Sequence, residues 1–231
     1  MAYDTILFDL DDTLFDFKLS EKNALHHAFL AFEQPSGLAD YHVSYKEISK
    51  GLWRDLEHGN MSLTELGVER FRRLFLQYGV EIDAEKFNRV YLEYLGKEAH
   101  LIKGAEELCV QLQPYVLAVV TNGFKEVQRS RIKRSPLRGT FDFIFTSEEV
   151  GFQKPDKRIF DYVFAKLGIY DKAKVLMVGD SLTSDIKGGI SYGIDTCWFN
   201  RHRQENNSKV KPKFEINELT DLIKMIKHES I

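Results

Sequence analysis

Hydrophobic positions follow two different patterns along the chain, and the change between them lies near residue 100. From about residue 16 to residue 100, apolar residues recur every three or four positions, which is typical of amphipathic helices. Gly, Pro and Asn residues interrupt this periodicity. The pattern predicts helices at residues 20–32, 43–57, 62–78 and 83–98. Ser62 and Glu65 have the spacing of a capping box for the third of them. Helices joined by such short turns indicate a helical bundle.

The remaining chain alternates short apolar runs with helical segments. The apolar runs predict strands at residues 6–8, 116–120, 143–145, 175–178, 196–199 and 214–216. Helices are expected at residues 105–112, 125–134, 156–167, 183–192 and 219–226. Alternation of this kind indicates an α/β fold with a Rossmann-like parallel sheet and helices on both faces. The predicted core comprises residues 1–15 and 101–231, and residues 16–100 form an inserted all-α domain. Residues 201–213 are polar, and we expect a mobile surface loop there.

Composition and charge exclude several classes of protein. The chain has 231 residues, of which 43% are hydrophobic and 29% charged, which is ordinary for a globular protein. A net charge of -3 gives no basic surface for nucleic acid or an anionic membrane. No apolar run approaches the ~20 residues of a membrane helix, and no basic segment precedes the first apolar run, so no secretory signal is expected. Cys109 and Cys197 lie far apart in apolar surroundings, which predicts buried free thiols in a reducing cytoplasm.

Three carboxylates directly follow the first predicted strand. Asp9 and Asp11 are two residues apart, a spacing that places both side chains on the same side of a strand and its continuation. Two such close charges would raise one pKa or attract a cation, and oxygen ligands suit Mg²⁺. Taken alone, the Asp11-Asp12-Thr13 stretch is equally well explained as a polar turn or a helix cap. The other strand ends therefore decide between these explanations.

Polar residues also follow the other predicted strands. They are Thr121, Asn122, Gly123, Lys154, Asp180, Ser181 and Asp185. Each alone has a simple structural explanation, such as a turn, a surface charge or a helix cap. Because the strands of a parallel sheet end at the same edge, these groups together supply carboxylates, one cation and hydroxyl and amide donors at one place. Mg²⁺-assisted phosphoryl transfer requires such a set: one carboxylate attacks phosphorus to form an aspartyl-phosphate, and a second moves protons.

The same residues resemble the four motifs of the haloacid dehalogenase superfamily of phosphohydrolases. The motifs occur in order as Asp9-Leu-Asp11-Asp12-Thr13, Thr121-Asn122, Lys154-Pro155 and Gly179-Asp180-Ser181-Leu-Thr-Ser-Asp185. The resemblance implies that Asp9 is the nucleophile and a Mg²⁺ ligand. It implies that Asp11 is the general acid and base and offers its backbone carbonyl to the metal. Lys154 would neutralise Asp9 and the phosphate.

The remaining motif residues receive supporting roles from the same resemblance. Thr121, Asn122 and Gly123 would bind the transferring phosphoryl group. Thr13 would hold the loop after the nucleophile close to the phosphate. Asp180 and Asp185 would complete the metal site. The dehalogenase branch lacks a carboxylate at the position of Asp11, so its presence here favours phosphate chemistry.

The resemblance also assigns the helical insertion. It is similar to the family's first type of cap domain, a bundle that closes over the site and excludes water. The flexible points would lie near residues 15–19 and 100–104. Candidates for contact with substrate are Trp53, Arg54, Arg70 and the turn at residues 58–60.

A finer resemblance concerns the substrate. The stretches at residues 121–124, 128, 136–137, 141–142 and 198–200 look like bacterial 5'-nucleotidases for pyrimidine and damaged nucleoside monophosphates. This implies a Mg²⁺-dependent phosphomonoesterase acting on nucleoside 5'-monophosphates. The alternatives are a sugar-phosphate phosphatase of the N-acylneuraminate 9-phosphate type, a phosphomutase, or a non-catalytic regulatory protein that binds Mg²⁺ or phosphate. The expected partner is a small phosphate monoester, with no nucleic acid and no membrane, and the expected state is a cytoplasmic monomer or weak homodimer.

Overall fold

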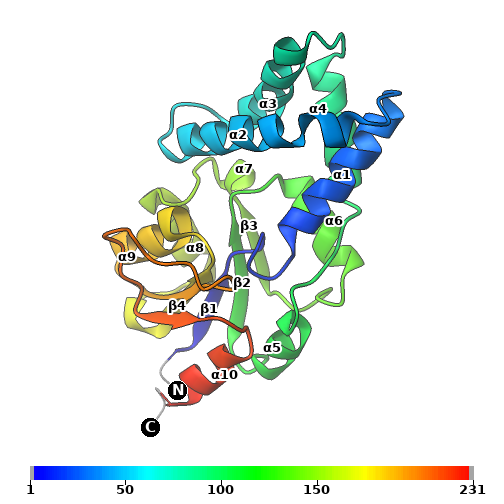
Figure 1. Ribbon diagram of the computed structural model, residues 1–231. Helices are drawn as coiled ribbons and strands as arrows, with labels where there is room; N and C mark the ends of the chain where they lie inside the picture. Colours follow the sequence, from blue (N-terminus) through cyan, green and yellow to red (C-terminus); the bar gives the residue numbers. More distant parts are fainter. Residues whose placement is uncertain (1–2, 229–231) are drawn as a thin grey trace. The chain divides into compact units, whose positions relative to one another are not determined.

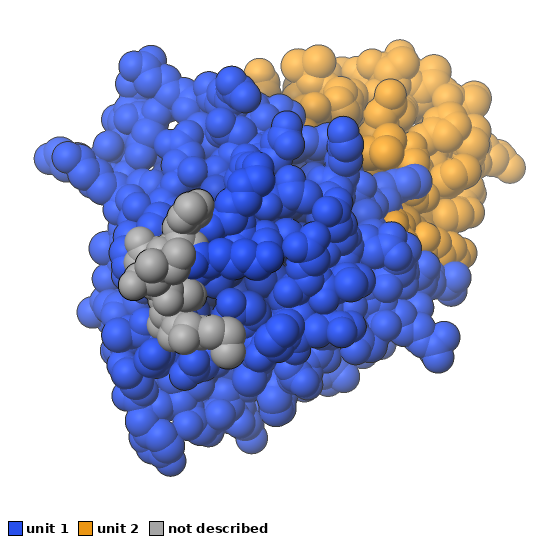
Figure 2. Space-filling model, turned by 90° about the horizontal axis from the view of Figure 1, so that it is seen from below, with its two compact units in different colours: residues 1–16, 100–231 blue, residues 17–99 orange. Residues whose placement is uncertain are grey.

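The computed structural model describes residues 3–228, which form two compact units. One unit contains the chain up to Asp16 and again from His100 onward, and the other contains residues 17–99 (Figure 2). In the described part of the chain, no helix combines the length and apolar character needed to cross a membrane.

The first unit is built on a parallel sheet of six strands within residues 3–228, in the order β3-β2-β1-β4-β5-β6. The strands are β1 (Thr5–Phe8), β2 (Val116–Thr121), β3 (Phe143–Thr146), β4 (Val175–Gly179), β5 (Asp195–Phe199) and β6 (Phe214–Ile216). This order is that of a doubly wound α/β fold, in which the direction of winding reverses beside β1. The predicted fold class is therefore confirmed. The polar strand ends of β1 and β4 lie side by side at the reversal point.

Helices cover both faces of this sheet (Figure 1). They are α5 (Ala105–Gln111), α6 (Lys125–Arg134), α7 (Ser147–Val150), α8 (Lys157–Leu167), α9 (Lys187–Tyr192) and α10 (Asp221–His228). A 3₁₀ turn spans Lys172–Lys174 and a π-helical turn spans Leu182–Ile186. α8 packs on one face through Ile159, Phe160 and Val163, which meet strand residues such as Leu7 and Met177. Burial of this apolar surface holds the strands in register and so fixes the ends that carry the polar residues.

The second unit contains four helices within residues 17–99. They are α1 (Phe17–Ala31), α2 (Gly37–Glu57), α3 (Leu63–Tyr78) and α4 (Ala84–Leu95). The aromatic ring of Phe71 lies at their centre, with ring centroids 4.7 Å from Phe87 and 5.4 Å from Tyr91. The capping box of α3 is present, since Ser62 Oγ accepts from the backbone N–H of Glu65 and the Glu65 carboxylate accepts from Ser62 N.

Several element boundaries differ from the prediction. α1 begins at Phe17, so Ser20 lies buried inside the helix and does not cap it. α2 begins at Gly37, six residues before the predicted start at Val43, because the chain resumes a helix directly after Pro35. A Cβ on Gly37 would lie 2.5 Å from the Phe29 ring, so this early start depends on glycine. The predicted helix at residues 183–192 is a π-helical turn followed by α9, and α7 was not predicted.

The two cysteines behave as expected. Cys109 and Cys197 are both buried free thiols. Burial raises the pKa of each thiol to about 12, so neither is a reactive thiolate.

Candidate active site

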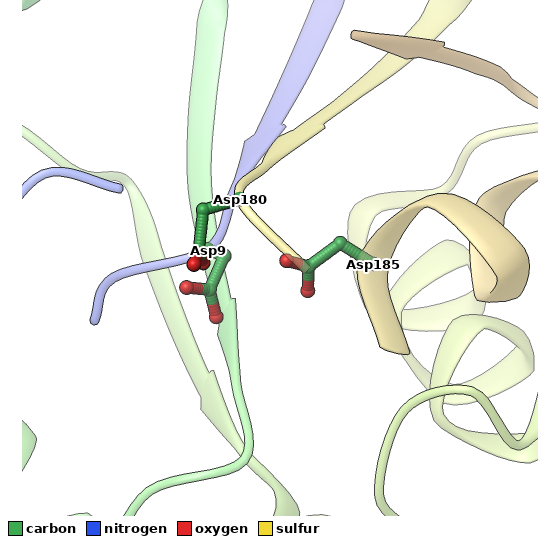
Figure 3. A group of neighbouring side chains, drawn as sticks. All are labelled: Asp9, Asp180 and Asp185. Atoms are coloured by element: carbon green, nitrogen blue, oxygen red, sulfur yellow. The ribbon is translucent and has the colours of Figure 1, made fainter. Parts of the chain in front are cut away.

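Three carboxylates converge where β1 and β4 end. Asp9 follows β1, and its backbone N–H donates to Val178 O at 2.9 Å, which fixes the strand end against β4. Asp180 follows β4, and Asp185 reaches the same place from the π-helical turn (Figure 3). One carboxylate oxygen from each of Asp9, Asp180 and Asp185 lies within 4.8 Å of the other two.

Lys154 supplies the cation that faces this group. Its side chain is fully buried, and its Nζ lies 2.6 Å from Asp9 Oδ1 and 2.7 Å from Asp185 Oδ1. The same ammonium donates to the backbone carbonyl of Val120. Burial lowers the pKa of Lys154, but the carboxylates of Asp185 and Asp9 outweigh this effect, so the pKa is raised and the residue stays cationic. One ammonium thus stands among three carboxylates.

Burial and the neighbouring carboxylates raise the pKa values of two members of this group, Asp9 and Asp180. Burial raises the pKa of Asp9 to about 7, the charges of Asp185 and Asp11 add to the rise, and Lys154 opposes it. Burial also raises the pKa of Asp180 well above its usual value, with further contributions from Asp185 and Asp9. Bringing another positive charge to these oxygens would relieve the same repulsion. The all-oxygen donor set fits a hard divalent cation of the Mg²⁺ type.

The carboxylate of Asp11 lies apart from this group. Its Oδ2 accepts from Gln128 Nε2 at 2.7 Å, and its Oδ1 accepts from Arg131 Nη1. Both donors belong to α6. The metal contribution expected of Asp11, through its backbone carbonyl, stays a prediction.

Thr13 connects the two strand ends through one hydroxyl. Its Oγ1 accepts from Asp180 N at 3.1 Å and lies 3.3 Å from Asp9 Oδ2 and 3.4 Å from Asp180 Oδ1. A hydroxyl has a single proton, so it donates to one carboxylate at a time. The structure thus places Thr13 between the two acids, and its predicted contact with phosphate stays a prediction.

In the Thr121-Asn122-Gly123 stretch, the side chains of Asn122 and Thr121 have different hydrogen-bond partners. Asn122 holds the backbone of Lys154, donating from Nδ2 to the carbonyl at 2.9 Å and accepting from the N–H at Oδ1 at 2.8 Å. Its side chain is therefore committed to the lysine loop. Thr121 Oγ1 accepts from Gly123 N at 3.2 Å and from Gln128 Nε2 at 3.1 Å, so its own proton is the one that could reach a phosphate oxygen.

The loop after β4 needs glycine at its start. Ser181 N donates to Asp185 Oδ2 at 3.0 Å, and a Cβ on Gly179 would lie 2.2 Å from that oxygen. Trp198 on β5 donates from Nε1 to the carbonyl of Asp180 at 2.8 Å. These contacts hold Asp180 and Asp185 toward Asp9.

Three supporting residues had no predicted place in the site. Gln128 and Arg131 are three residues apart on the helix that follows Thr121, so they share one face, and that spacing was the available signal. Trp198 lies in the stretch at residues 198–200 that resembles the nucleotidases, but no spacing indicated its contact with Asp180, since its indole N–H reaches that residue only through the pairing of β4 with β5.

Among the predicted substrate contacts in the second unit, the prediction for Arg70 is wrong. Its side chain is only 2% exposed and donates to Gly67 O, Tyr45 Oη and Asn88 Oδ1 inside the helical bundle. Arg54 is exposed and Trp53 is half-buried, so both stay predictions, as does the exposed turn at residues 58–60.

Comparison with known proteins agrees with this geometry. The family model for haloacid dehalogenase-like hydrolases matches residues 3–193. The chain belongs to this family of hydrolases and is an enzyme. The crystal structure of HAD-hydrolase YfnB from Bacillus subtilis, bound to magnesium, superposes with a TM-score of 0.92 at 39% identity, covering 98% of this chain and 100% of that one.

Two curated relatives carry more specific names. Pyrimidine 5'-nucleotidase PynA of Streptococcus pneumoniae is 38% identical over 96% of this chain and 94% of its own length. Pyrimidine 5'-nucleotidase YjjG of Escherichia coli is 34% identical over 98% of this chain and 99% of its own length. These are the proteins that the chain is similar to over nearly its whole length.

Proposed function

We propose that this enzyme is a Mg²⁺-dependent phosphomonoesterase that hydrolyses nucleoside 5'-monophosphates, pyrimidine nucleotides above all, through an aspartyl-phosphate on Asp9. The observation that carries the proposal is the buried contact of Asp9 with Lys154 at 2.6 Å, beside the carboxylates of Asp180 and Asp185. Two relatives named pyrimidine 5'-nucleotidases, at 38% and 34% identity, support the choice of substrate.

In the proposed reaction, Asp9 is the nucleophile and Asp11 is the general acid and base. An Asp9 oxygen attacks phosphorus, the bond from phosphorus to the leaving oxygen breaks, and Asp11 gives that oxygen a proton. A water molecule then attacks the phosphorus of the aspartyl-phosphate and loses a proton to Asp11, which releases phosphate and restores Asp9. Lys154 offsets the negative charge of Asp9 and of the incoming phosphate, and Thr121 donates to a phosphate oxygen.

The metal would be held by Asp9, Asp180 and Asp185, together with the backbone carbonyl of Asp11. When bound, Mg²⁺ supplies positive charge that offsets the repulsion between a carboxylate and an anionic ester. The relative YfnB, described with bound magnesium, supports this assignment.

The helical unit of residues 17–99 is proposed as the cap that selects the substrate, and its Arg54, Trp53 and residues 58–60 are the proposed contacts. Buried free thiols at Cys109 and Cys197 support the cytoplasm as the proposed location.

The proposal is tested by measuring phosphate release from pyrimidine and purine nucleoside monophosphates, sugar phosphates and p-nitrophenyl phosphate. Each is measured with Mg²⁺ and with chelator. We expect pyrimidine 5'-monophosphates to be the best substrates and the chelator to abolish release.

Asp9→Asn is the decisive variant, because it replaces the nucleophilic carboxylate by a neutral, non-nucleophilic amide of the same size. It should lower kcat by at least about 10⁴-fold. Asp4→Asn, an exposed aspartate just before β1, is the matched control and should keep wild-type activity. Release from sugar phosphates alone would replace the substrate class, and no release from any ester would overturn the phosphatase assignment.

A further inference from the structure

Both oxygens of the Asp11 carboxylate accept hydrogen bonds from side chains of one helix, α6. Arg131 Nη1 donates to Oδ1, and Gln128 Nε2 donates to Oδ2 at 2.7 Å. Both donors are almost completely buried, at 0% and 1% exposure, whereas the Asp11 side chain keeps 27%. A carboxylate held at both oxygens has its plane and its direction fixed.

The two donors are also fixed relative to each other. Arg131 Nη1 donates to Gln128 Oε1 at 3.0 Å, which orients the amide so that its nitrogen faces Asp11. The guanidinium lies 4.8 Å from the centre of the Phe15 ring, a contact that limits its rotation. The donor set is therefore rigid before any substrate arrives.

Gln128 extends the network to the proposed phosphate site. The same Nε2 that donates to Asp11 lies 3.1 Å from Thr121 Oγ1. A Cβ on Gly123 would lie 2.2 Å from this Nε2, so the glycine of the Thr-Asn-Gly stretch leaves the space that Gln128 occupies. Gly123 is therefore needed for steric reasons, and its contact with phosphate stays a prediction.

We propose that Arg131 and Gln128 are positioning residues that hold Asp11 in the orientation needed for proton transfer, apart from the cation-binding carboxylates. This inference rests on the proposed function. Asp11 is two residues from Asp9, and a free carboxylate there could turn toward the metal as a further ligand. A carboxylate turned toward the metal would face away from the leaving oxygen, and a rotating one is misplaced for it.

Comparing two esters with different leaving groups distinguishes a positioning role of Arg131 and Gln128 from a merely structural one. A nucleoside leaves as a basic alkoxide and needs a proton from Asp11, whereas p-nitrophenolate leaves without one. The readout is the pre-steady-state burst of nucleoside or p-nitrophenol, which reports formation of the aspartyl-phosphate before water attacks.

The variants are Arg131→Met and Gln128→Met, with Arg131→Lys as a variant that keeps the charge. Arg129→Met is the control, because Arg129 lies on the same helix, is exposed and pairs with Glu149. We expect Arg131→Met to slow the nucleoside burst by about 10²-fold and Gln128→Met by about 10-fold, with KM within about twofold of wild type. The p-nitrophenol burst of Arg131→Met should change by less than about threefold, and Arg131→Lys should recover part of the loss. Because Gln128 also donates to Thr121, Gln128→Met should slow the p-nitrophenol burst too, but less than the nucleoside burst. Arg129→Met should match wild type on both esters.

A double variant tests whether Arg131 acts through Asp11. In the Asp11→Asn background, adding Arg131→Met should change the p-nitrophenol and nucleoside bursts by less than about twofold. Thermal unfolding and near-ultraviolet circular dichroism establish that each variant is folded, and Gln128→Met tests the same claim if Arg131→Met does not fold.

Equal slowing of both esters by Arg131→Met and Gln128→Met, or additive losses in the double variant, would overturn the positioning role. So would unchanged nucleoside bursts in both variants. A wild-type enzyme that releases phosphate from no ester would instead overturn the proposed function, so the two failures are distinguishable.

Discussion

Lys154 of the α/β unit and Arg70 of the helical unit are both buried cations, and their partners differ. In the α/β unit, Lys154 contacts the carboxylates of Asp9 and Asp185, with Asp180 nearby. In the helical unit, Arg70 donates to a backbone carbonyl, an amide and a phenol, namely Gly67 O, Asn88 Oδ1 and Tyr45 Oη.

The surroundings extend the contrast. The Arg70 guanidinium lies 4.6 Å from the Tyr91 ring centre and 5.0 Å from that of Phe71, and the Tyr45 hydroxyl that accepts from it donates to Glu21 at 2.9 Å. Its hydrogen bonds and ring contacts therefore stabilise the packing of the bundle. Around Lys154, carboxylates outnumber the ammonium, and burial together with the neighbouring carboxylates raises the pKa values of Asp9 and Asp180. A buried cation with neutral partners indicates a structural role, while one amid excess carboxylate indicates a site for a further cation and an anionic ester.

The largest expected effect comes from removing the cation of the α/β unit. Lys154→Met should lower kcat by about 10²–10³-fold, because Asp9 and the phosphate then lose their only lysine partner in the described site. Steady-state kinetics on a nucleoside monophosphate measures the change. Lys157→Met, an exposed lysine at the start of α8, should be unaffected, and equal kinetics for both variants would contradict the assigned role of Lys154.

Removing the cation of the helical unit should act on stability instead. Arg70→Met leaves Asn88 and Tyr45 without their donor and should lower the free energy of unfolding by about 2–3 kcal/mol. Denaturant unfolding measures this, with the exposed Arg72→Met as control. At a temperature where the variant is folded, its kcat should stay near that of wild type, and a loss of kcat as large as that of Lys154→Met would remove the distinction between the two cations.

Mg²⁺ should stabilise the enzyme through the carboxylates around Lys154. At a concentration about 100 times Kd, binding adds about 2.7 kcal/mol to the free energy of unfolding. Thermal scans with Mg²⁺ and with chelator should show this gain in wild type and in Arg70→Met, and little of it in Asp180→Asn. An undiminished gain in Asp180→Asn would place the metal elsewhere.

The smallest expected effect concerns an exposed polar contact of the helical unit. Ser62→Ala removes the side-chain half of the α3 capping box and should cost about 1 kcal/mol of stability. Chemical denaturation measures it, with Thr64→Ala, an exposed position in the first turn of the same helix, as control. A cost above that of Arg70→Met would contradict the view that the buried guanidinium is the main polar support of the bundle.

The sheet and the meeting of its polar strand ends followed from local patterns. Strands such as residues 6–8 and 175–178 are continuous apolar runs, and parallel pairing brings the residues after them to one edge. The family membership followed from residues that stand in order at those ends.

The contacts that could not be predicted join side chains to residues far away in the sequence, and they depend on the direction in which each side chain points. Asn122 turns to the backbone of Lys154, 32 residues away, and Arg131 reaches Asp11, 120 residues away. Arginine is a charged residue that usually lies on the surface, and only the packing of α3 against α2 and α4 buries Arg70. The early start of α2 and the π-helical turn before α9 depend on close packing at Gly37 and Gly179, which no periodicity reveals.

The most direct test of the central claim is to trap the phosphoryl group on the protein. The enzyme is mixed with a nucleoside monophosphate and Mg²⁺, quenched with borohydride, which reduces an acyl phosphate to an alcohol, and digested for mass spectrometry. We predict that the peptide containing residue 9 carries homoserine at that position in wild type and not in Asp9→Asn. Active enzyme that shows reduction at another carboxylate, or none at residue 9 across the time course of turnover, would contradict the assignment of Asp9 as the nucleophile.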